Sequence, residues 1–369
     1  MPEPKRQTNF ELLRIVAMLL VVTMNFAWHA GLPLRLTDTV NAYNLFGTAL
    51  ESLCVGAVNV FVILTGYFMV KAHFQFRRFF RLLCQVLFYT LLIPLVLALW
   101  GLPLVAEEEG AAGAIAYILP VSTGHYWFIT AYVPLYLISP FLNTAFQKIP
   151  QKQLGRILII MLALYSGIKS FVPFSLRADD FGYGLAWFVC LYLTGAYIRI
   201  YGVPILDKKG RGLLLYLASA AMIFAGKMAG YYFYGTGGLS KYFFEIPFHY
   251  NFLFAYLAAV GLFVAFAQYI IKEGRAAAAI RWVAPLVLGV YLLHMNIDIR
   301  DSWYSWTQHL FGGLWSLGFV GMVGDLLVTV LLVFLAGIAV DSLRRAIFVV
   351  VEKKLVDEYY AGKGGKVEQ

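Results

Sequence analysis

Charged side chains are scarce in this chain of 369 residues. They make up 13% of it, whereas apolar residues make up 61% and the mean hydropathy is +0.74. No polar stretch is long enough for a separate soluble domain, and windows of about twenty apolar residues, the length that crosses a hydrocarbon core, recur throughout. The composition therefore excludes a soluble enzyme and predicts an all-α, polytopic integral membrane protein.

Cysteine is equally rare. The three cysteines, Cys54, Cys84 and Cys190, fall within apolar stretches, and their spacing fits neither a disulfide framework nor a metal site. We therefore expect them to be packing residues, and we expect no metal ion. Internal repeats with matched broken helices are not recognisable either, which disfavours a transporter.

The apolar windows predict about ten transmembrane helices. Thr8 and Glu11 form a capping-box pattern, which predicts that the first helix starts near Thr8. We expect this helix to be retained, since no small-x-small cleavage site follows it. The predicted domain covers residues 1–345 and is followed by a short polar tail, 346–369. The ten helices are predicted at 10–31, 44–70, 78–103, 126–146, 156–174, 183–201, 212–234, 251–271, 282–299 and 317–341.

The distribution of basic residues predicts the orientation of these helices. The net charge is +9, and most of the 29 lysines and arginines lie at alternate helix ends, as the positive-inside rule requires of cytoplasmic loops. Both termini are then cytoplasmic, and the acidic run 107–109 is external. Because topology accounts for the basic excess, we expect membrane lipids and no nucleic acid among the partners.

The first helix carries an arginine inside its apolar run. Arg14 and Asn25 are eleven residues apart, close to three helical turns, so they share a face and are separated by roughly 16 Å along the axis. An arginine embedded in a membrane helix is energetically expensive and marks a functional site. His29 follows Asn25 by one turn and faces nearly the same way, towards a possible common cavity, or lies at the interface beside Trp28.

A second basic feature begins the third predicted helix. Arg77, Arg78 and Arg81 are spaced i, i+3 and i, i+4, so their guanidinium groups can converge on one polyanion at the membrane surface. Anchoring to anionic lipid headgroups is the alternative. Arginine rather than lysine at all three positions favours bidentate phosphate recognition.

Several short motifs occur in order over almost the whole chain. They are Arg14 with position 25, Phe61–Tyr67, Arg77–Arg81, Tyr126–Phe128, Tyr136–Asn143, Trp187–Arg199 and Gly289–His294. These motifs together resemble the bacterial membrane acyltransferase-3 family. The resemblance implies a ten-helix protein of the bacterial inner membrane that transfers an acyl group, usually acetyl, from cytoplasmic acyl-CoA to a cell-surface or lipid-linked saccharide.

One position departs from this family pattern. The family has its catalytic histidine where this chain has Asn25. An amide has no useful basicity near neutral pH, whereas imidazole titrates there, so the chain as written is expected to be an impaired enzyme. Three explanations stay open: an engineered inactivating change, natural divergence, or rescue by His29. Direct transfer and a covalent acyl-imidazole intermediate both remain possible for a histidine at this position.

The resemblance also assigns roles to further residues. Arg14, Arg77, Arg78 and Arg81 would bind the nucleotide phosphates of acetyl-CoA or another acyl-CoA, which acts as co-substrate. Oligomeric state stays open between monomer and homodimer. The competing functions are a transporter or flippase of a lipid-linked saccharide and a noncatalytic partner in envelope assembly.

Other polar groups fall within or beside the apolar helices. Glu51 belongs to the outer half of the second helix, which makes it the candidate to orient a histidine at position 25. His125, Tyr126 and Trp127 are expected at the outer mouth, where they could touch the acceptor, although a solvated loop histidine is the alternative for His125. Embedded groups that must face a cavity or a partner are Glu51, Lys169, Lys227, His294 and Asp325.

Overall fold

The computed structural model describes residues 7–174, 180–234 and 237–364, with side chains described as far as Val350. These residues contain helices and connecting segments but no strand, which confirms the all-α prediction. The longer helices are α1 (Thr8–His29), α2 (Ala42–Cys54), α3 (Ala57–Met69), α4 (Phe76–Leu99), α7 (Trp127–Lys148), α8 (Gln151–Leu162), α10 (Leu185–Tyr201), α11 (Arg211–Ala229), α13 (Leu253–Ala267), α14 (Arg275–Val283), α15 (Val287–His294) and α17 (Gly318–Gly364). Shorter helices are α5 (Val105–Glu109), α6 (Ala111–Ile118), α9 (Ile168–Phe171), α12 (Gly238–Glu245) and α16 (Trp303–Phe311).

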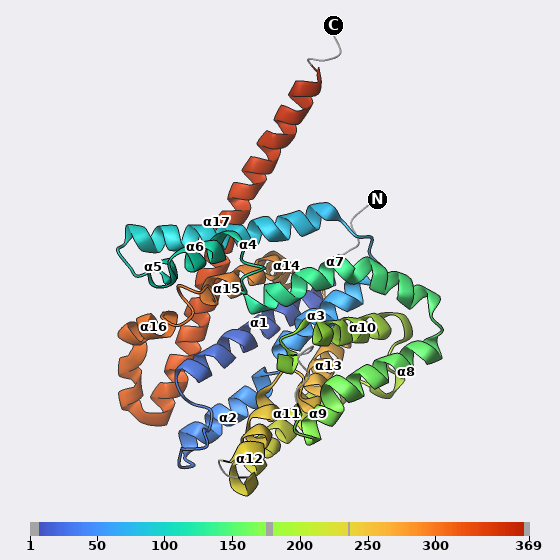
Figure 1. The fold of residues 1–369 in the computed structure, drawn as a ribbon, viewed down its shortest axis with the longest axis vertical. Helices are drawn as coiled ribbons and strands as arrows, with labels where there is room; N and C mark the ends of the chain where they lie inside the picture. Colours follow the sequence, from blue (N-terminus) through green and yellow to red (C-terminus); the bar gives the residue numbers. More distant parts are fainter. Residues whose placement is uncertain (1–6, 175–179, 235–236, 365–369) are drawn as a thin grey trace.

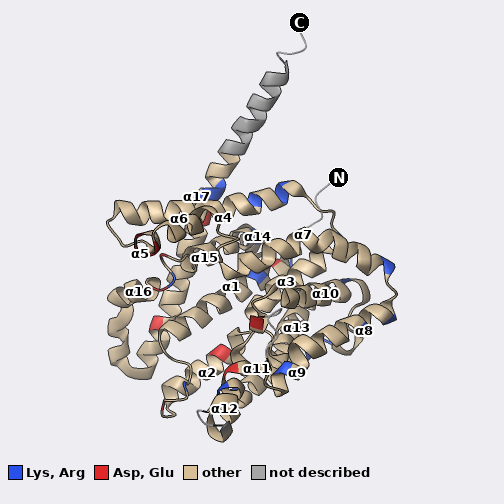
Figure 2. Cartoon of the chain, in the orientation of Figure 1, with Lys and Arg blue, Asp and Glu red and all other residues tan. Residues whose placement is uncertain are grey.

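Nine helical stretches of the described chain are long and apolar enough to cross a membrane, and α10, with 17 residues, is a shorter apolar helix. The chain is thus a polytopic membrane protein with about the predicted number of spans. Helical conformation satisfies every backbone polar group within the segment itself, which is the requirement for a chain surrounded by lipid. Figure 2 shows how few charged residues the described ribbon carries.

Several predicted boundaries differ from the structure. The predicted helix 44–70 is two consecutive helices, α2 and α3, interrupted at Val55 and Gly56. The predicted helix 251–271 is preceded by α12 in the same apolar stretch, and the predicted helix 282–299 ends at His294. α17 passes the predicted domain boundary at residue 345 without a break. The tail beyond residue 350 falls outside the described side chains.

The start of α1 is where the sequence predicts it, but the predicted capping box is absent. Gln7 occupies the N-cap position and makes no side-chain cap hydrogen bond. The Glu11 carboxylate instead accepts from Arg14, and the Thr8 hydroxyl accepts from Arg281 of α14 at 2.8 Å. A charged partner at i+3 and a guanidinium from another helix therefore replace the backbone contacts that the motif anticipates.

α1 occupies the centre of the bundle (Figure 1). It packs against α2, α3, α13, α14, α15 and α17. Because most of its faces meet other helices, its polar side chains face protein cavities or protein partners. This central position makes α1 the helix around which the functional site forms.

The pair α3 and α10 approaches unusually closely. A Cβ added to Gly66 would lie 2.0 Å from the Tyr192 carbonyl oxygen, and one added to Gly195 would lie 2.0 Å from the Ile63 carbonyl oxygen. Small residues that allow such backbone contact are a general device of membrane helix packing. Here they fix the position of α3, whose Phe61 and Thr65 line a cavity beside α1.

Candidate active site

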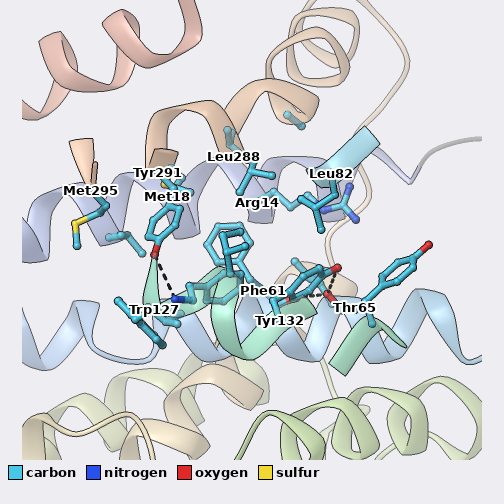
Figure 3. A pocket seen from close by; sticks show the side chains of 18 of the residues that line it. Arg14, Met18, Phe61, Thr65, Leu82, Trp127, Tyr132, Leu288, Tyr291 and Met295 are labelled. Carbon is cyan, nitrogen blue, oxygen red and sulfur yellow. Dashed lines mark hydrogen bonds between the residues drawn. The ribbon is translucent and has the colours of Figure 1, made fainter. Parts of the chain in front are cut away.

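One cavity of the bundle runs beside α1 and contains both residues singled out on that helix. Its volume is about 370 Å³, and Arg14 and Asn25 both belong to its wall. We call it the Arg14 cavity. Figure 3 shows it between α1 and α3, with Arg14 and Leu82 towards one end and Trp127 and Met295 towards the other. The two α1 residues therefore share one compartment, as helical periodicity predicts.

The walls between these ends are mostly aromatic and aliphatic. α3 contributes Phe61 and Thr65, and α7 contributes Tyr132 and Tyr136. The Thr65 hydroxyl donates to the Phe61 carbonyl at 2.8 Å, and its oxygen lies 3.4 Å from the Tyr132 hydroxyl, so its polar group is already bonded within the wall. An apolar channel with few polar groups suits a flexible, weakly polar chain.

Arg14 is stabilised locally. Its guanidinium forms an ion pair with Glu11, one turn earlier, at 3.0 Å, and lies 5.6 Å from the centroid of the Phe68 ring. The side chain remains 34% exposed, so the pair leaves part of the guanidinium accessible. A guanidinium carries five donors, and a bound anion could therefore use those that Glu11 does not.

Asn25 lies where the Arg14 cavity meets a second cavity. Its amide donates to the Val21 carbonyl at 2.9 Å, a bond to the preceding turn of α1. Met24, Asn25, Trp127, Tyr250 and Met295 belong to the walls of both cavities. Position 25 therefore faces the junction, where groups approaching from the two cavities would meet.

The second cavity, of about 510 Å³, is more polar. Its wall includes Trp28, Glu51, Lys227, Glu245 and His249, and we call it the Glu51 cavity. Glu51 is buried. One of its carboxylate oxygens accepts from the Trp28 indole at 3.4 Å, and the other has no partner among the described residues. The wall thus holds a buried acceptor available to a ligand.

The predicted pairing of Glu51 with position 25 is not a hydrogen bond in this chain. Both residues lie in the wall of the Glu51 cavity, but the carboxylate bonds Trp28 and the Asn25 amide bonds Val21. An asparagine amide reaches less far than an imidazole and is already used by its own helix. Glu51 and Asn25 therefore line the same cavity without a hydrogen bond between them.

His29 is directed away from these cavities. Its ring stacks on Tyr304 of α16 at 6.0 Å and meets the edge of Trp303 at 5.3 Å. It belongs to the wall of neither the Arg14 cavity nor the Glu51 cavity. The common cavity expected for His29 and Asn25 is therefore not formed, because packing against α16 determines the direction of the ring.

The arginines at the start of α4 do not all converge on one cavity. Arg78 lies in the wall of the Arg14 cavity and of a third cavity, which also contains Arg81. Arg77 is exposed and lies in the wall of none of the three cavities. Because successive helix positions differ by about 100°, Arg77 and Arg78 point to different neighbours.

Of the three residues predicted near an acceptor, Trp127 alone belongs to the wall of one of the three described cavities. It lies in the wall of both cavities and stacks on Tyr250, with ring centroids 5.3 Å apart. The solvated loop predicted as the alternative for His125 is wrong, since this residue is 3% exposed. Tyr126 is buried as well and donates to the Leu292 carbonyl at 2.7 Å.

Hydrogen bonds fix the His125 ring. Nδ1 lies 3.1 Å from the Ala116 carbonyl, which can only accept, so Nδ1 carries the proton, and Nε2 accepts from the Asn296 amide at 3.1 Å. Burial lowers the pKa of His125 to about 4. His125 is therefore neutral at physiological pH, and its contacts are those of a structural residue.

The remaining embedded polar groups have partners inside the protein. Lys227 donates to the Phe244 carbonyl at 3.0 Å, and the Lys169 ammonium lies 4.4 Å from the Phe181 ring centroid. Asp325 accepts from Trp315 at 2.8 Å, and His294 bonds the Val290 carbonyl at 2.6 Å. Within the described part of the chain, no group of three His, Cys, Asp or Glu side chains could hold a metal ion.

Comparison with known families identifies the protein class. The profile of an acyltransferase domain, the acyltransferase-3 type, matches residues 7–340. The chain belongs to the acyltransferase-3 family. The match begins at α1 and ends within α17, so it contains the walls of the Arg14 cavity and the Glu51 cavity. No curated protein and no solved structure matches the chain. It is therefore a multi-pass membrane acyltransferase by family.

Sequence reasoning missed several cavity residues. Tyr250 lies in the wall of both cavities, and Arg344 lies beside Arg81 in the third cavity. A tyrosine in a loop between two apolar helices gives no local signal of this kind. In the sequence, Arg344 is marked only by its place next to Arg345 after an apolar helix. Two adjacent arginines at such a place indicate membrane topology rather than a binding site.

Proposed function

We propose that this acyltransferase moves an acetyl group, or a similarly small acyl group, from acyl-CoA to a hydroxyl of a saccharide at the cell surface or on a lipid carrier. The observation that carries the proposal is the Arg14 cavity, which connects Arg14 and Arg78 at one end with Asn25 at the other. The cationic groups at one end match the phosphate-rich head of the donor, and the proposed reaction site at position 25 matches its reactive tail.

In this proposal different parts of the cavity bind chemically different parts of the donor. Arg14 and Arg78 attract the phosphates by charge-assisted hydrogen bonds. The apolar walls around Phe61 and Tyr132 hold the flexible arm and exclude water from it. The thioester then reaches position 25, at the junction with the Glu51 cavity.

The acceptor hydroxyl approaches from the Glu51 cavity. Its oxygen attacks the thioester carbonyl, the C–S bond breaks, the hydroxyl proton is taken up by a base, and the sulfur leaves as the CoA thiol. Asn25 cannot serve as that base, so we propose that the chain as written transfers slowly. A bacterial inner membrane with both termini in the cytoplasm is the matching location, since acyl-CoA is cytoplasmic.

The test is titration of the purified protein with acetyl-CoA and free CoA. We expect Arg14→Ala and Arg78→Ala each to weaken binding by about tenfold, the value of one charge-assisted contact. Lys152→Ala is the matched control, because this exposed residue of α8 lies in the wall of none of the three cavities, and its affinity should equal that of the native chain.

Two results would contradict the proposal. Unchanged affinity in both arginine variants would remove the donor site from the Arg14 cavity. Saccharide movement across vesicle membranes without any binding of acyl-CoA would instead support the competing function, a flippase.

A further inference from the structure

Few side chains in the two cavity walls are able to take up a proton. Asn25 carries an amide, so the proton of the acceptor hydroxyl needs a carboxylate or an imidazole elsewhere. Within the described part of the chain, the carboxylate and imidazole side chains of the two walls are Glu51, Glu245 and His249, and all three belong to the Glu51 cavity. Tyrosine hydroxyls, which both walls also contain, are poor bases near neutral pH.

Two of these three side chains have contacts away from α1. Glu245 is exposed and pairs with Lys241, one turn earlier on α12, at 3.7 Å. The His249 ring stacks on Phe181, which lies shortly before α10, with ring centroids 4.7 Å apart. Glu51, in contrast, is hydrogen-bonded to α1 itself. It is therefore the group most directly connected with position 25.

The contact that connects Glu51 with α1 comes from the turn that follows Asn25. The Trp28 indole donates to Glu51 Oε1 at 3.4 Å, and Trp28 follows Asn25 by three residues, which places these two side chains on one face of α1. The side chain of Glu51 is buried, and Oε2 has no partner among the described residues, although buried polar atoms are normally hydrogen-bonded. The carboxylate therefore lies on the same side of α1 as position 25, with one oxygen left for a ligand.

The surroundings of Glu51 include groups that stabilise a carboxylate. Besides the Trp28 indole, the wall of the Glu51 cavity contains Lys227. The Lys227 ammonium donates to the Phe244 carbonyl at 3.0 Å and lies 3.2 Å from the centroid of the Phe244 ring, contacts that hold a cation in place. A cation and an N–H donor in the same wall favour a negative charge on Glu51, and a proton acceptor needs that charge.

We propose that Glu51 accepts the proton of the acceptor hydroxyl in this chain, in place of the imidazole that position 25 lacks. The proposal rests on the proposed function and adds a catalytic residue to it. The hydroxyl oxygen bonds to the thioester carbonyl carbon, its proton passes to Glu51 Oε2, and the C–S bond breaks to release the CoA thiolate. Return of the proton from Glu51 to the thiolate restores the carboxylate and gives the CoA thiol, so an acyl-CoA and an alcohol yield an ester and a thiol without any further reactant.

The contribution of Glu51 should be smaller than that of a well-placed base. A positioned general base accelerates transfer by about 10²–10⁴-fold. Glu51 belongs to α2, and its other carboxylate oxygen is bonded to Trp28, so it is not directed at the junction by α1 as a histidine at position 25 would be. We therefore expect about a tenfold contribution, below that range.

The experiment measures transfer from radiolabelled acetyl-CoA in membrane vesicles that supply the acceptor. Glu51→Gln should lower the turnover rate at saturating acetyl-CoA by about tenfold and leave acetyl-CoA affinity unchanged, because an amide still accepts from Trp28 but is not basic. Glu51→Asp keeps a carboxylate and should transfer faster than Glu51→Gln. Glu108→Gln is the matched control, because this exposed carboxylate of α5 lies in the wall of none of the three cavities, and its rate should equal that of the native chain.

The same change in the Asn25→His background separates a base from a structural group. An imidazole at position 25 takes over the proton, so Glu51→Gln should then reduce the rate by about twofold or less. An equal loss in both backgrounds would assign Glu51 to packing or to acceptor binding and overturn the proposal. If the Glu51→Gln protein does not fold, Glu51→Asp takes its place in this comparison, and its loss should again be larger with Asn25 than with histidine.

Three further results are decisive. Transfer at the native rate by Glu51→Gln, with the loss found for His249→Gln instead, would assign the proton to His249 and overturn the proposal. A native chain that binds acetyl-CoA but transfers nothing, while Asn25→His is active, would also overturn it and leave the proposed function intact. Failure of the native chain to bind acetyl-CoA at all would instead refute the proposed function.

Discussion

Replacement of Asn25 by histidine is expected to increase acyl transfer strongly. The same chain shows how an imidazole sits on such a helix. His294 Nδ1 lies 2.6 Å from the Val290 carbonyl, four residues earlier, and Nε2 has no partner among the described residues. Asn25 makes the equivalent i−4 bond to Val21 at 2.9 Å. A histidine at position 25 can therefore donate from Nδ1 to Val21 and keep an unprotonated Nε2 for the junction of the two cavities.

The magnitude follows from that geometry. A positioned general base accelerates proton transfer by about 10²–10⁴-fold, which corresponds to lowering the barrier by about 3–5 kcal/mol. We expect a gain in this range for Asn25→His. The Asn25→Gln variant is the control, because it keeps an amide of similar polarity without basicity, and we expect it to show no gain.

The assay follows radiolabelled acetyl-CoA in membrane vesicles, which supply the acceptor, with release of the CoA thiol as a second readout. Acetyl-CoA affinity is measured on the same preparations. If Asn25→His binds acetyl-CoA as the native chain does but transfers no faster than Asn25→Gln, position 25 is not the site of the base, and the reasoning that places the chemistry at the junction is wrong.

Two further predictions concern stability. Gly195→Ala should destabilise the protein by about 2 kcal/mol or more, because its Cβ would overlap the Ile63 carbonyl, whereas Gly313→Ala has open space and should leave the melting temperature unchanged. Equal melting temperatures would contradict the close packing of α3 and α10. Burial lowers the pKa of His125 from the ordinary 6.5 to about 4. As the pH falls from 6.5 to 4, the unfolded chain takes up a proton on this histidine that the folded chain does not. The free energy of unfolding should therefore fall by about 3 kcal/mol over this pH range. His125→Gln should flatten this dependence in thermal melts, and an unchanged slope would refute the burial argument.

Much of the architecture could be predicted from the sequence because its signals are local. Hydropathy identifies a stretch that must be helical in lipid, so the spans were recovered to within a few residues at most ends. The shared compartment of Arg14 and Asn25 follows from helical periodicity alone. The errors arose where an apolar stretch is interrupted, as at Val55 and Gly56, since hydropathy averages over such a break.

The sequence by itself determined that the chain is a helical membrane protein and that Arg14 and Asn25 line one face of its first helix, because both depend only on residues close together along the chain. Only the tertiary structure decided which neighbours the other groups meet. Packing turned His29 towards α16, and it placed Arg81 and Arg345, which are more than half of the chain apart, in the wall of one cavity. Helix rotation and contact depend on the shapes of two surfaces at once, and a single sequence pattern describes only one of them.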